Sequence, residues 1–297
     1  MGSEDGSGAG GAIAIAGAGR IGQALGRLLR ERGEPVVAVA SRSPERARAA
    51  ARFVGGVRAV GYSEAPECAS RVLIAVPDDA LSSVAEAVAG AGMKDGACLH
   101  TCGTRGPEAL AVLAAQGVSC GALHPLQTVA SPEQGLSALP GAAFAVTGEG
   151  PAAAWAQRIV ALLDGLVLRI PAERRPLYHA AAVMASNYVV GLIDAAVMLM
   201  GAAGVEEDKA LRALAPLVRA SSMNALTLGP LKALTGPIER GDVETVSLHM
   251  QALAETSAPV REFYRSAGLY VVTLARRKGL PAASARKLEE LLRGGDD

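Results

Sequence analysis

The stretch AIAIAGAGRIG at residues 12–22 decides the fold of the N-terminal half. Its apolar start predicts a short buried strand, and the segment from Ile21 to Arg32 that follows has helical spacing. Between them stands a G-x-G-x-x-G pattern, which alone is weak in a chain with 35 glycines. A strand before the pattern and a helix after it are the context in which such a turn cradles the phosphates of a dinucleotide. We therefore predict a dinucleotide site here, rather than a glycine turn in a ligand-free α/β domain.

Each glycine of this turn has an expected role. Gly17 allows the tight turn, Gly19 lets the pyrophosphate approach the backbone, and Gly22 lets helix and strand pack closely. The helix N-terminus adds free N–H groups and the positive end of its dipole. The cofactor residues predicted in the turn are Gly17, Ala18, Gly19, Arg20, Ile21 and Gly22.

Outward from the turn, strand and helix patterns alternate as far as residue 170. Because the strand-like runs are continuously apolar, they are expected to be covered on both faces, as in a mostly parallel sheet. We predict an α/β dinucleotide-binding domain over residues 12–170, after a polar, disordered lead at residues 1–11. The apolar runs lie at 35–41, 71–77, 97–101, 118–124, 142–148 and 167–170.

After Pro171 no strand signal of comparable length appears, and residues 171–297 are predicted to form an all-helical domain. Its first helix, 175–203, is apolar on almost every side, so it must be buried by neighbours or by a partner subunit. This pattern favours a homodimer formed through the helical domain. The further helices are expected at 206–228, 241–256, 258–278 and 283–293.

The end of the second apolar run selects between the two nicotinamide dinucleotides. A site for NAD places Asp or Glu here to bind the ribose 2′-OH, but no acid occurs between Glu34 and Glu45. Ser41, Arg42 and Ser43 instead offer donors for a 2′-phosphate, which favours NADP(H) over a solvated loop arginine. Arg20 adds a second cation.

Two further loops follow apolar runs and are expected at the same sheet edge, where ligands bind. In VPDDA (76–80) we expect Asp78 to cap the next helix. The HTCGT loop (100–104) suits close approach to the nicotinamide. The cofactor residues predicted in these loops are Val76, Pro77, Thr101 and Gly103.

Composition excludes several function classes. The formal net charge is zero, so no basic surplus is available for nucleic acid. The N-terminal lead has no signal peptide, and the longest uncharged apolar run, between His179 and Asp194, is judged too short and too polar to cross a membrane. The four cysteines form no C-x-x-C pair, as in a reducing compartment. A cytoplasmic protein with a small-molecule substrate is expected.

Four motifs, HTCGT (100–104), GALHPLQTV (121–129), YHAAAVMASNY (178–188) and TGPIERGD (235–242), resemble the Rossmann-like and DUF2520 domain-containing proteins. That family is similar in layout to ketopantoate reductases, pyrroline-5-carboxylate reductases and β-hydroxyacid dehydrogenases. The resemblance implies an NAD(P)-dependent enzyme whose second domain is all-α, of the 6-phosphogluconate dehydrogenase C-terminal-like type, and dimerises.

One departure from the β-hydroxyacid dehydrogenases affects the chemistry. Those enzymes place a catalytic Lys four residues before an Asn on the first long helix of the second domain. Asn187 fits the Asn position, but Val183 stands where the lysine belongs, so the lysine mechanism does not transfer. His179 falls on the same helical face and is the candidate proton donor.

The remaining candidates keep their alternatives open. His124 and His179 are expected to flank the nicotinamide, or to be hydrogen-bonded structural residues. No His pair has metal-ligand spacing, so no metal is expected. Ser186 and Asn187 bind substrate or join helices, and Thr235 and Arg240 reach the substrate or lie on the surface. The predicted catalytic residues are His179, Asn187 and His124, and the predicted substrate-binding residues are Ser186, Thr235 and Arg240.

The sequence thus favours an NADP(H)-dependent oxidoreductase that reduces a small carbonyl or imine compound. A second hypothesis is a non-catalytic NADP(H)-binding or redox-sensing protein, which the missing lysine favours. A metal-assisted dehydrogenase is the third and weakest.

Overall fold

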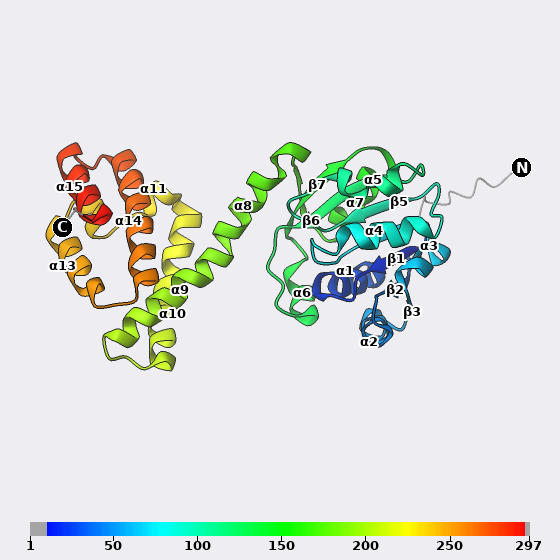
Figure 1. The fold of residues 1–297 in the computed structure, drawn as a ribbon, viewed down its shortest axis with the longest axis horizontal. Coiled ribbons are helices and arrows are strands. Elements are labelled where there is room, and N and C mark those ends of the chain that lie inside the picture. Colours follow the sequence, from blue (N-terminus) through cyan, green and yellow to red (C-terminus); the bar gives the residue numbers. More distant parts are fainter. Residues whose placement is uncertain (1–10, 295–297) are drawn as a thin grey trace, which may run out of the picture. The chain divides into compact units, whose positions relative to one another are not determined.

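The computed structural model describes residues 11–294, and its contacts divide the chain into two units between Ser186 and Asn187 (Figure 1). Apart from Gly11, the predicted disordered lead at 1–11 lies outside the described residues. The unit boundary falls sixteen residues after the predicted domain limit at 170/171. The reason is that the first long helix after Pro171 packs with the α/β unit, where its Arg175 is completely buried.

The first unit is built on one eight-stranded sheet in the order β3-β2-β1-β4-β5-β6-β7-β8. Every neighbouring pair is parallel except β6 and β7, which confirms the mostly parallel sheet. The sequence missed β3, which is only three residues long. The strands are β1 (Ile13–Ala16), β2 (Val36–Ala40), β3 (Arg58–Val60), β4 (Arg71–Ile74), β5 (Ala97–His100), β6 (Ser119–Pro125), β7 (Ala143–Gly148) and β8 (Leu166–Arg169).

Helices cover both faces of this sheet, as the continuously apolar strands require. In β1, Ile13 and Ile15 face one core, while Ala14 and Ala16 face the other, because successive side chains point to opposite sides. The isoleucine face packs under α1 (Arg20–Glu31), α2 (Pro44–Val54) and α7 (Gly150–Leu162). The alanine face packs under α3 (Ala65–Cys68), α4 (Leu81–Gly90) and α5 (Ala111–Ala114). A further helix, α6 (Pro132–Ala138), lies against α1.

The prediction of a single helix over 175–203 is wrong, because the segment forms two helices. It is divided at Ser186 into α8 (Arg175–Ala185) and α9 (Asn187–Ala202). The Ser186 backbone leaves helical geometry, with φ −127° and ψ −74°, and its hydroxyl donates to the Ala182 carbonyl at 2.7 Å. Such a bond to the preceding turn competes with regular helix geometry.

The second unit is entirely helical among the residues that the structure describes. Its core gathers Val246, Val272, Leu288 and Leu292 with their neighbours. Asp242 caps α13 by accepting the Thr245 N–H at 3.0 Å, at the helix start that Gly241-Asp242 indicates in the sequence. The remaining helices are α10 (Glu207–Leu228), α11 (Pro230–Ala233), α12 (Pro237–Arg240), α13 (Val243–Ala254), α14 (Ala258–Lys278) and α15 (Ala282–Arg293).

The segment Ala172–Ala202 is long and apolar enough to cross a membrane by length and composition, contrary to the sequence estimate for its central run. None of its most apolar window is buried within the structure. Large apolar side chains such as Leu177, Val190 and Leu192 are at least half exposed. Within residues 11–294, the segment therefore stays exposed, although its apolar sequence predicts that neighbours or a partner bury it.

Candidate functional site

The register of the sheet brings the predicted cofactor loops to one edge. Ala16, Ile74, His100 and Ala122 are successive cross-strand neighbours in β1, β4, β5 and β6. All four strands run in the same direction, so the residues that follow them emerge together at the carboxyl edge. With neighbouring strands about 4.8 Å apart, the glycine turn after β1 lies about 14 Å along this edge from β6.

The glycine turn after β1 separates two kinds of glycine. Gly17 has φ +141°, and a Cβ there would stand 2.1 Å from the Ala75 carbonyl oxygen. A Cβ on Gly22 would stand 2.3 Å from the Gly17 carbonyl oxygen. Gly19 differs, because its nearest heavy atom would be 3.9 Å away and its φ of −82° suits any residue. The fold itself therefore needs glycine at 17 and 22, but leaves open space at 19.

The open space at Gly19 faces the start of α1, and this helix has no side-chain cap. A helix start without a cap and with glycine at its approach is suited to a phosphate group. The residues present thus fit a dinucleotide pyrophosphate. Two other predicted cofactor residues adjoin the turn: Val76, whose Cγ1 would lie 3.2 Å from a Cβ on Gly17, and Ala18, whose carbonyl accepts from Gln23.

The three cofactor residues predicted in the loop after β2 have different environments. Ser43 caps α2, because its hydroxyl accepts the Arg46 N–H at 3.3 Å. Ser41 is almost buried and accepts the Ser43 N–H. Arg42 is exposed and, within residues 11–294, makes no hydrogen bond or ion pair. Arg20 donates to the Ala130 carbonyl at 3.3 Å and is thus held toward the loop before α6.

The loops after β4 and β5 contact each other. Thr101 donates its N–H to the Ile74 carbonyl, and Pro77 lies in the turn that leads to α4. The expected helix cap at Asp78 is wrong, since α4 begins at Leu81 and its N-cap residue is Ala80. The Asp78 carboxylate instead accepts the Thr104 hydroxyl at 3.4 Å, so it joins the two loops.

A cluster of three rings forms where the β5 loop, β6 and α8 meet. The His124 Nδ1 and the Tyr178 hydroxyl are hydrogen-bonded at 2.8 Å, and the His124 and His179 rings meet edge to face at 5.8 Å between centroids. Gly103 packs directly beneath them. A Cβ there would lie 2.4 Å from His179 Cδ2 and 3.0 Å from His124 Nε2. The HTCGT loop and two of the histidines predicted to be catalytic thus lie side by side.

Beneath this cluster lies Arg175, the largest fully buried side chain of the structure. Its Nη1 donates to Thr147 Oγ1 at 2.9 Å and its Nη2 donates to the Cys102 carbonyl at 2.7 Å. These bonds tie the start of α8 to β7 and to the HTCGT loop. Arg175 therefore fixes the position from which Tyr178 and His179 project.

Burial and nearby positive charge keep His100 and His124 neutral. Desolvation, with the nearby Arg175 and His179, lowers the pKa of His124 to about 4. Desolvation likewise lowers the pKa of His100 to about 4. His100 is fully used structurally: its Nε2 donates to the Gly106 carbonyl at 2.8 Å, and its Nδ1 accepts the Cys102 N–H. His100 therefore shapes the loop rather than taking part in the chemistry.

Four predicted site residues lie at or beyond the break in the helix. Ser186 and Asn187 occupy the break itself, so the continuous helical face expected from His179 to Asn187 is interrupted. Thr235 is exposed before α12, and Arg240 is exposed at the end of α12. The remaining histidine, His249, is exposed and bonded to the Tyr264 hydroxyl at 2.8 Å. The substrate-binding roles of Ser186, Thr235 and Arg240 stay predictions.

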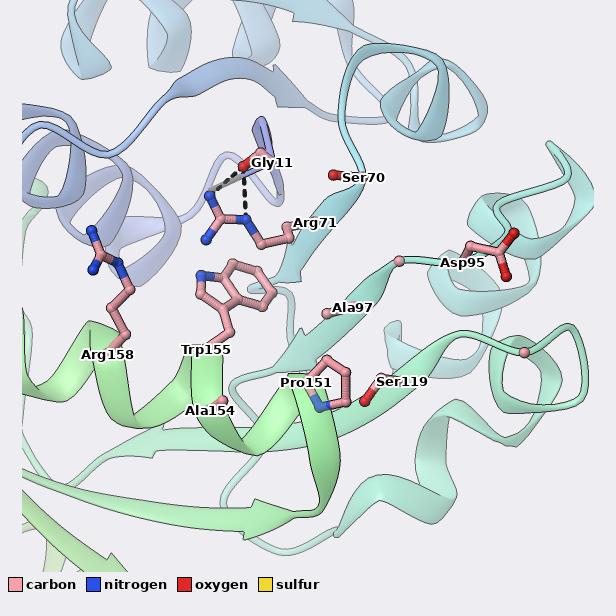
Figure 2. A pocket seen from close by; sticks show the side chains of 12 residues that line it. Gly11, Ser70, Arg71, Asp95, Ala97, Ser119, Pro151, Ala154, Trp155 and Arg158 are labelled. Carbon is pink, nitrogen blue, oxygen red and sulfur yellow. Dashed lines mark hydrogen bonds between the residues drawn. The ribbon is translucent and has the colours of Figure 1, made fainter. Parts of the chain in front are cut away.

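A cavity of about 790 Å³ lies at the opposite, amino edge of the sheet (Figure 2). Its charged wall is satisfied internally. Arg71 donates to the Gly11 carbonyl and to Glu34, and Arg158 forms an ion pair with Glu34 at 2.6 Å. The Arg71 guanidinium also lies 5.4 Å from the Trp155 ring centre. Arg71, Glu34 and Arg158 are thus paired with one another at the edge of the sheet opposite to the predicted cofactor loops.

Comparison with family models agrees with this architecture. A Rossmann-like domain model matches residues 5–125, and the model of a domain of unknown function, DUF2520, matches residues 142–271. The chain is a Rossmann-like and DUF2520 domain-containing protein. The DUF2520 match begins one residue before β7 and ends within α14, so it includes the last two strands of the sheet as well as most of the helices that follow. None of the curated proteins compared with the chain matches it.

Solved structures share the fold at low identity. A Bacteroides fragilis protein provisionally described as an NADP oxidoreductase is 22% identical, with a TM-score of 0.69 over 91% of this chain and 98% of that one. The reductive aminase of Aspergillus terreus, solved with NADPH and ethyl-5-oxohexanoate, is 19% identical with a TM-score of 0.57, covering 96% and 93%. The 1-pyrroline-5-carboxylate reductase of Streptococcus pyogenes is 17% identical with a TM-score of 0.58, covering 96% and 97%. The likeness shows a shared fold.

The sequence analysis missed two residues of the candidate site. Tyr178 and Arg175 lie in the segment RRPLYH, where the arginines resemble solvated cations at a helix start. Their spacing could have identified them, because residues three or four positions apart lie on one face of a helix, as Arg175 does with both Tyr178 and His179. Burial of Arg175 is a property of the packed structure and has no signature in the sequence.

Proposed function

We propose that the chain is an NADP(H)-dependent oxidoreductase that reduces a small carbonyl or imine compound. The observation that carries the proposal is the placement of the glycine turn and of the His124–Tyr178–His179 cluster along one carboxyl edge of one sheet. Shared fold with described reductases supports it. We also propose that the protein is soluble and cytoplasmic.

The cofactor residues have distinct tasks in this proposal. The start of α1 and Gly19 hold the pyrophosphate, while Arg42 and the Ser41 hydroxyl bind the 2′-phosphate. Thr101 and Gly103 line the approach of the nicotinamide. When bound, NADPH supplies a hydride from nicotinamide C4.

The ring cluster supplies the proton and orients the substrate. His179 donates a proton to the carbonyl oxygen or imine nitrogen of the substrate, while the neighbouring carbon receives the hydride. His124 and Tyr178 hold each other through their 2.8 Å hydrogen bond and fix the neighbouring His179 ring. The neutral state of His124 keeps it a hydrogen-bonding group across the ordinary pH range.

The test is turnover with purified protein. NADPH oxidation is measured with a panel of short keto acids, cyclic ketones and cyclic imines, and the best substrate is then taken to His179→Ala. Turnover is expected to fall at least tenfold, as for loss of a general acid. His249→Ala, an exposed histidine, is the matched control. Undiminished activity in His179→Ala removes that residue from the mechanism.

Cofactor choice is tested separately. Arg42→Asp removes the exposed cation and places a carboxylate where an NAD site has one, so preference should move toward NADH by at least tenfold. Exposed Arg48→Asp on α2 serves as the charge-matched control. If the ratio of kcat/KM for NADPH to kcat/KM for NADH is the same before and after Arg42→Asp, the assignment of Arg42 is contradicted.

A non-catalytic NADP(H)-binding protein is the second candidate, and Val183 at the expected lysine position favours it. It predicts tight binding of NADP(H), measured by calorimetry, without turnover on any member of the panel. If the protein turns over one substrate of the panel, and this turnover depends on His179, the protein is an enzyme and the second candidate is excluded.

A further inference from the structure

The Tyr178 hydroxyl has one hydrogen-bond partner among residues 11–294. That partner is His124 Nδ1 at 2.8 Å, and the two rings meet edge to face with 5.6 Å between their centroids. Tyr178 projects from near the start of α8, which the bonds of buried Arg175 tie to β7 and to the HTCGT loop. The position of the hydroxyl is therefore set by α8 on one side and by the imidazole of β6 on the other.

The tautomer of His124 decides what this hydroxyl can do, because a phenol has one hydrogen and can also accept. If Nδ1 carries a hydrogen, it donates to Tyr178 Oη, and the tyrosine hydrogen is free for another acceptor. If Nδ1 is unprotonated, it accepts the tyrosine hydrogen, which is then used. A doubly protonated imidazole also carries a hydrogen on Nδ1, so the first arrangement does not depend on the charge of His124.

The second nitrogen of His124 favours the first arrangement. Nε2 faces Gly103, where a Cβ would lie 3.0 Å away, and within the described part of the chain Nε2 makes no hydrogen bond. In protein interiors a donor without a partner is rarer than an acceptor without one. The half-buried imidazole is therefore expected to carry its hydrogen on Nδ1, where Tyr178 Oη accepts it. No other group among residues 11–294 accepts the hydrogen of Tyr178.

A free hydroxyl hydrogen at this place suits a carbonyl oxygen better than an imine nitrogen. Hydride addition to a carbonyl carbon moves the π electron pair onto oxygen, which has lone pairs for two donors, here Tyr178 and His179. An imine nitrogen has a single lone pair, which the proton from His179 occupies. A donor placed where negative charge develops stabilises the transition state of carbonyl reduction.

We propose that Tyr178 is a catalytic residue whose hydroxyl, held by the Nδ1–H of His124, donates a hydrogen bond to the carbonyl oxygen of the substrate. This deepens the proposed function and rests on it. The hydrogen bond transfers no atom, so hydride and proton move as they do in the proposed function. His124 is a positioning residue, since it acts through the tyrosine hydroxyl.

The tautomer is tested without cofactor or turnover. Two-bond correlation spectra of ¹⁵N-labelled protein at neutral pH show which imidazole nitrogens carry hydrogen, and the signals of His124 are those lost in His124→Asn. A hydrogen on Nδ1 is expected, and Tyr178→Phe should shift this signal. Tyr264→Phe should not, although Tyr264 has the same 2.8 Å bond to another imidazole, that of His249. An unprotonated Nδ1 overturns the proposal, whatever the protein reduces.

Turnover gives the second arm, because Tyr178→Phe removes only the hydroxyl. Its kcat for cyclohexanone should fall about 100-fold, as for loss of one donor to an oxyanion. KM should stay nearly constant, since the interaction strengthens in the transition state. Turnover of the six-membered cyclic imine should fall less. His124→Asn should cost less in the Tyr178→Phe background than alone, and Tyr264→Phe is again the matched control.

The outcomes separate the inference from the proposed function. An unchanged kcat in Tyr178→Phe, or a wild type that reduces the imine alone, overturns the role of Tyr178 and leaves the proposed function standing. A wild type that reduces no member of the panel overturns the proposed function and the role of Tyr178 with it. Should Tyr178→Phe fail to fold, the tautomer of wild-type His124 still decides.

Discussion

At the scale of single residues, the three glycines of the first turn are not equivalent. Gly17 and Gly22 are required by contacts within the protein, whereas Gly19 has no close protein neighbour. The sequence pattern treats all three alike, and their roles separate only when the surrounding atoms are known. Glycine at position 19 is explained by a molecule that approaches from outside.

This difference predicts that two alanine substitutions affect different quantities, one the stability of the fold and the other the binding of NADP⁺. Gly22→Ala should lower the free energy of unfolding by about 1–3 kcal/mol, because its Cβ meets backbone. Gly19→Ala should leave stability within about 0.5 kcal/mol and weaken NADP⁺ binding at least tenfold. Urea denaturation and calorimetry measure the two quantities. Unweakened NADP⁺ binding by Gly19→Ala would falsify the phosphate role.

Two buried imidazoles predict how stability depends on pH. The pKa values of His100 and His124 are about 4 in the folded chain, against about 6.5 when unfolded. As pH falls from about 6.5 to 4, the unfolded chain takes up these protons first, so the free energy of unfolding falls. Each imidazole contributes up to about 3 kcal/mol to this loss, which ends below about pH 4.

The measurement is urea denaturation at pH 7, 5.5 and 4.5. His124→Asn should show a smaller loss of stability between pH 7 and 4.5 than wild type. His249→Asn, at an exposed position, should show the wild-type loss. The same loss in all three proteins would contradict the burial argument for His124.

At the scale of elements, the site is made by packing the HTCGT loop between β6 and the start of α8. Arg175 bonds the loop carbonyl of Cys102, and Gly103 admits the two imidazoles. The sequence predicted each piece separately, since strands, loops and helices follow from local patterns. Their convergence depends on the order of strands in the sheet, which local patterns do not encode.

Gly103→Ala tests this packing. Its Cβ would collide with His179 and crowd His124, so the rings must shift. Turnover should fall at least tenfold, because displacements of about 1 Å carry such costs. Gly90→Ala, at the end of α4 with no atom within 4 Å, is the matched control. A Gly103→Ala enzyme with full turnover would show that the rings near it do not carry the chemistry.

At the scale of the whole molecule, the exposed apolar segment from α8 to α9 requires a partner. So many exposed large apolar side chains in one segment are rare on monomers. We propose that a second copy of the chain covers it, in a homodimer formed through the helical domain. The neutral net charge is compatible with self-association.

The dimer is tested by sedimentation equilibrium. Wild type should have about twice the chain mass of 30.1 kDa. Val190→Glu, at a position 69% exposed on α9, should dissociate the dimer at micromolar concentration without loss of helical content. Leu248→Glu on α13, also exposed, should leave the mass unchanged. A monomeric wild type, or a membrane-associated one, would refute the proposal.

The sequence by itself determined the alternation of strands and helices, the glycine turn and the all-helical second half, because apolar periodicity and turn residues act over a few positions. It also supplied His124, His179 and Gly103 as separate candidates. Only the tertiary structure decided that these three meet, that Ser186 interrupts the long helix, and that Arg175 is completely buried. Those facts arise from contacts between segments distant in the chain, which local patterns of residues do not encode.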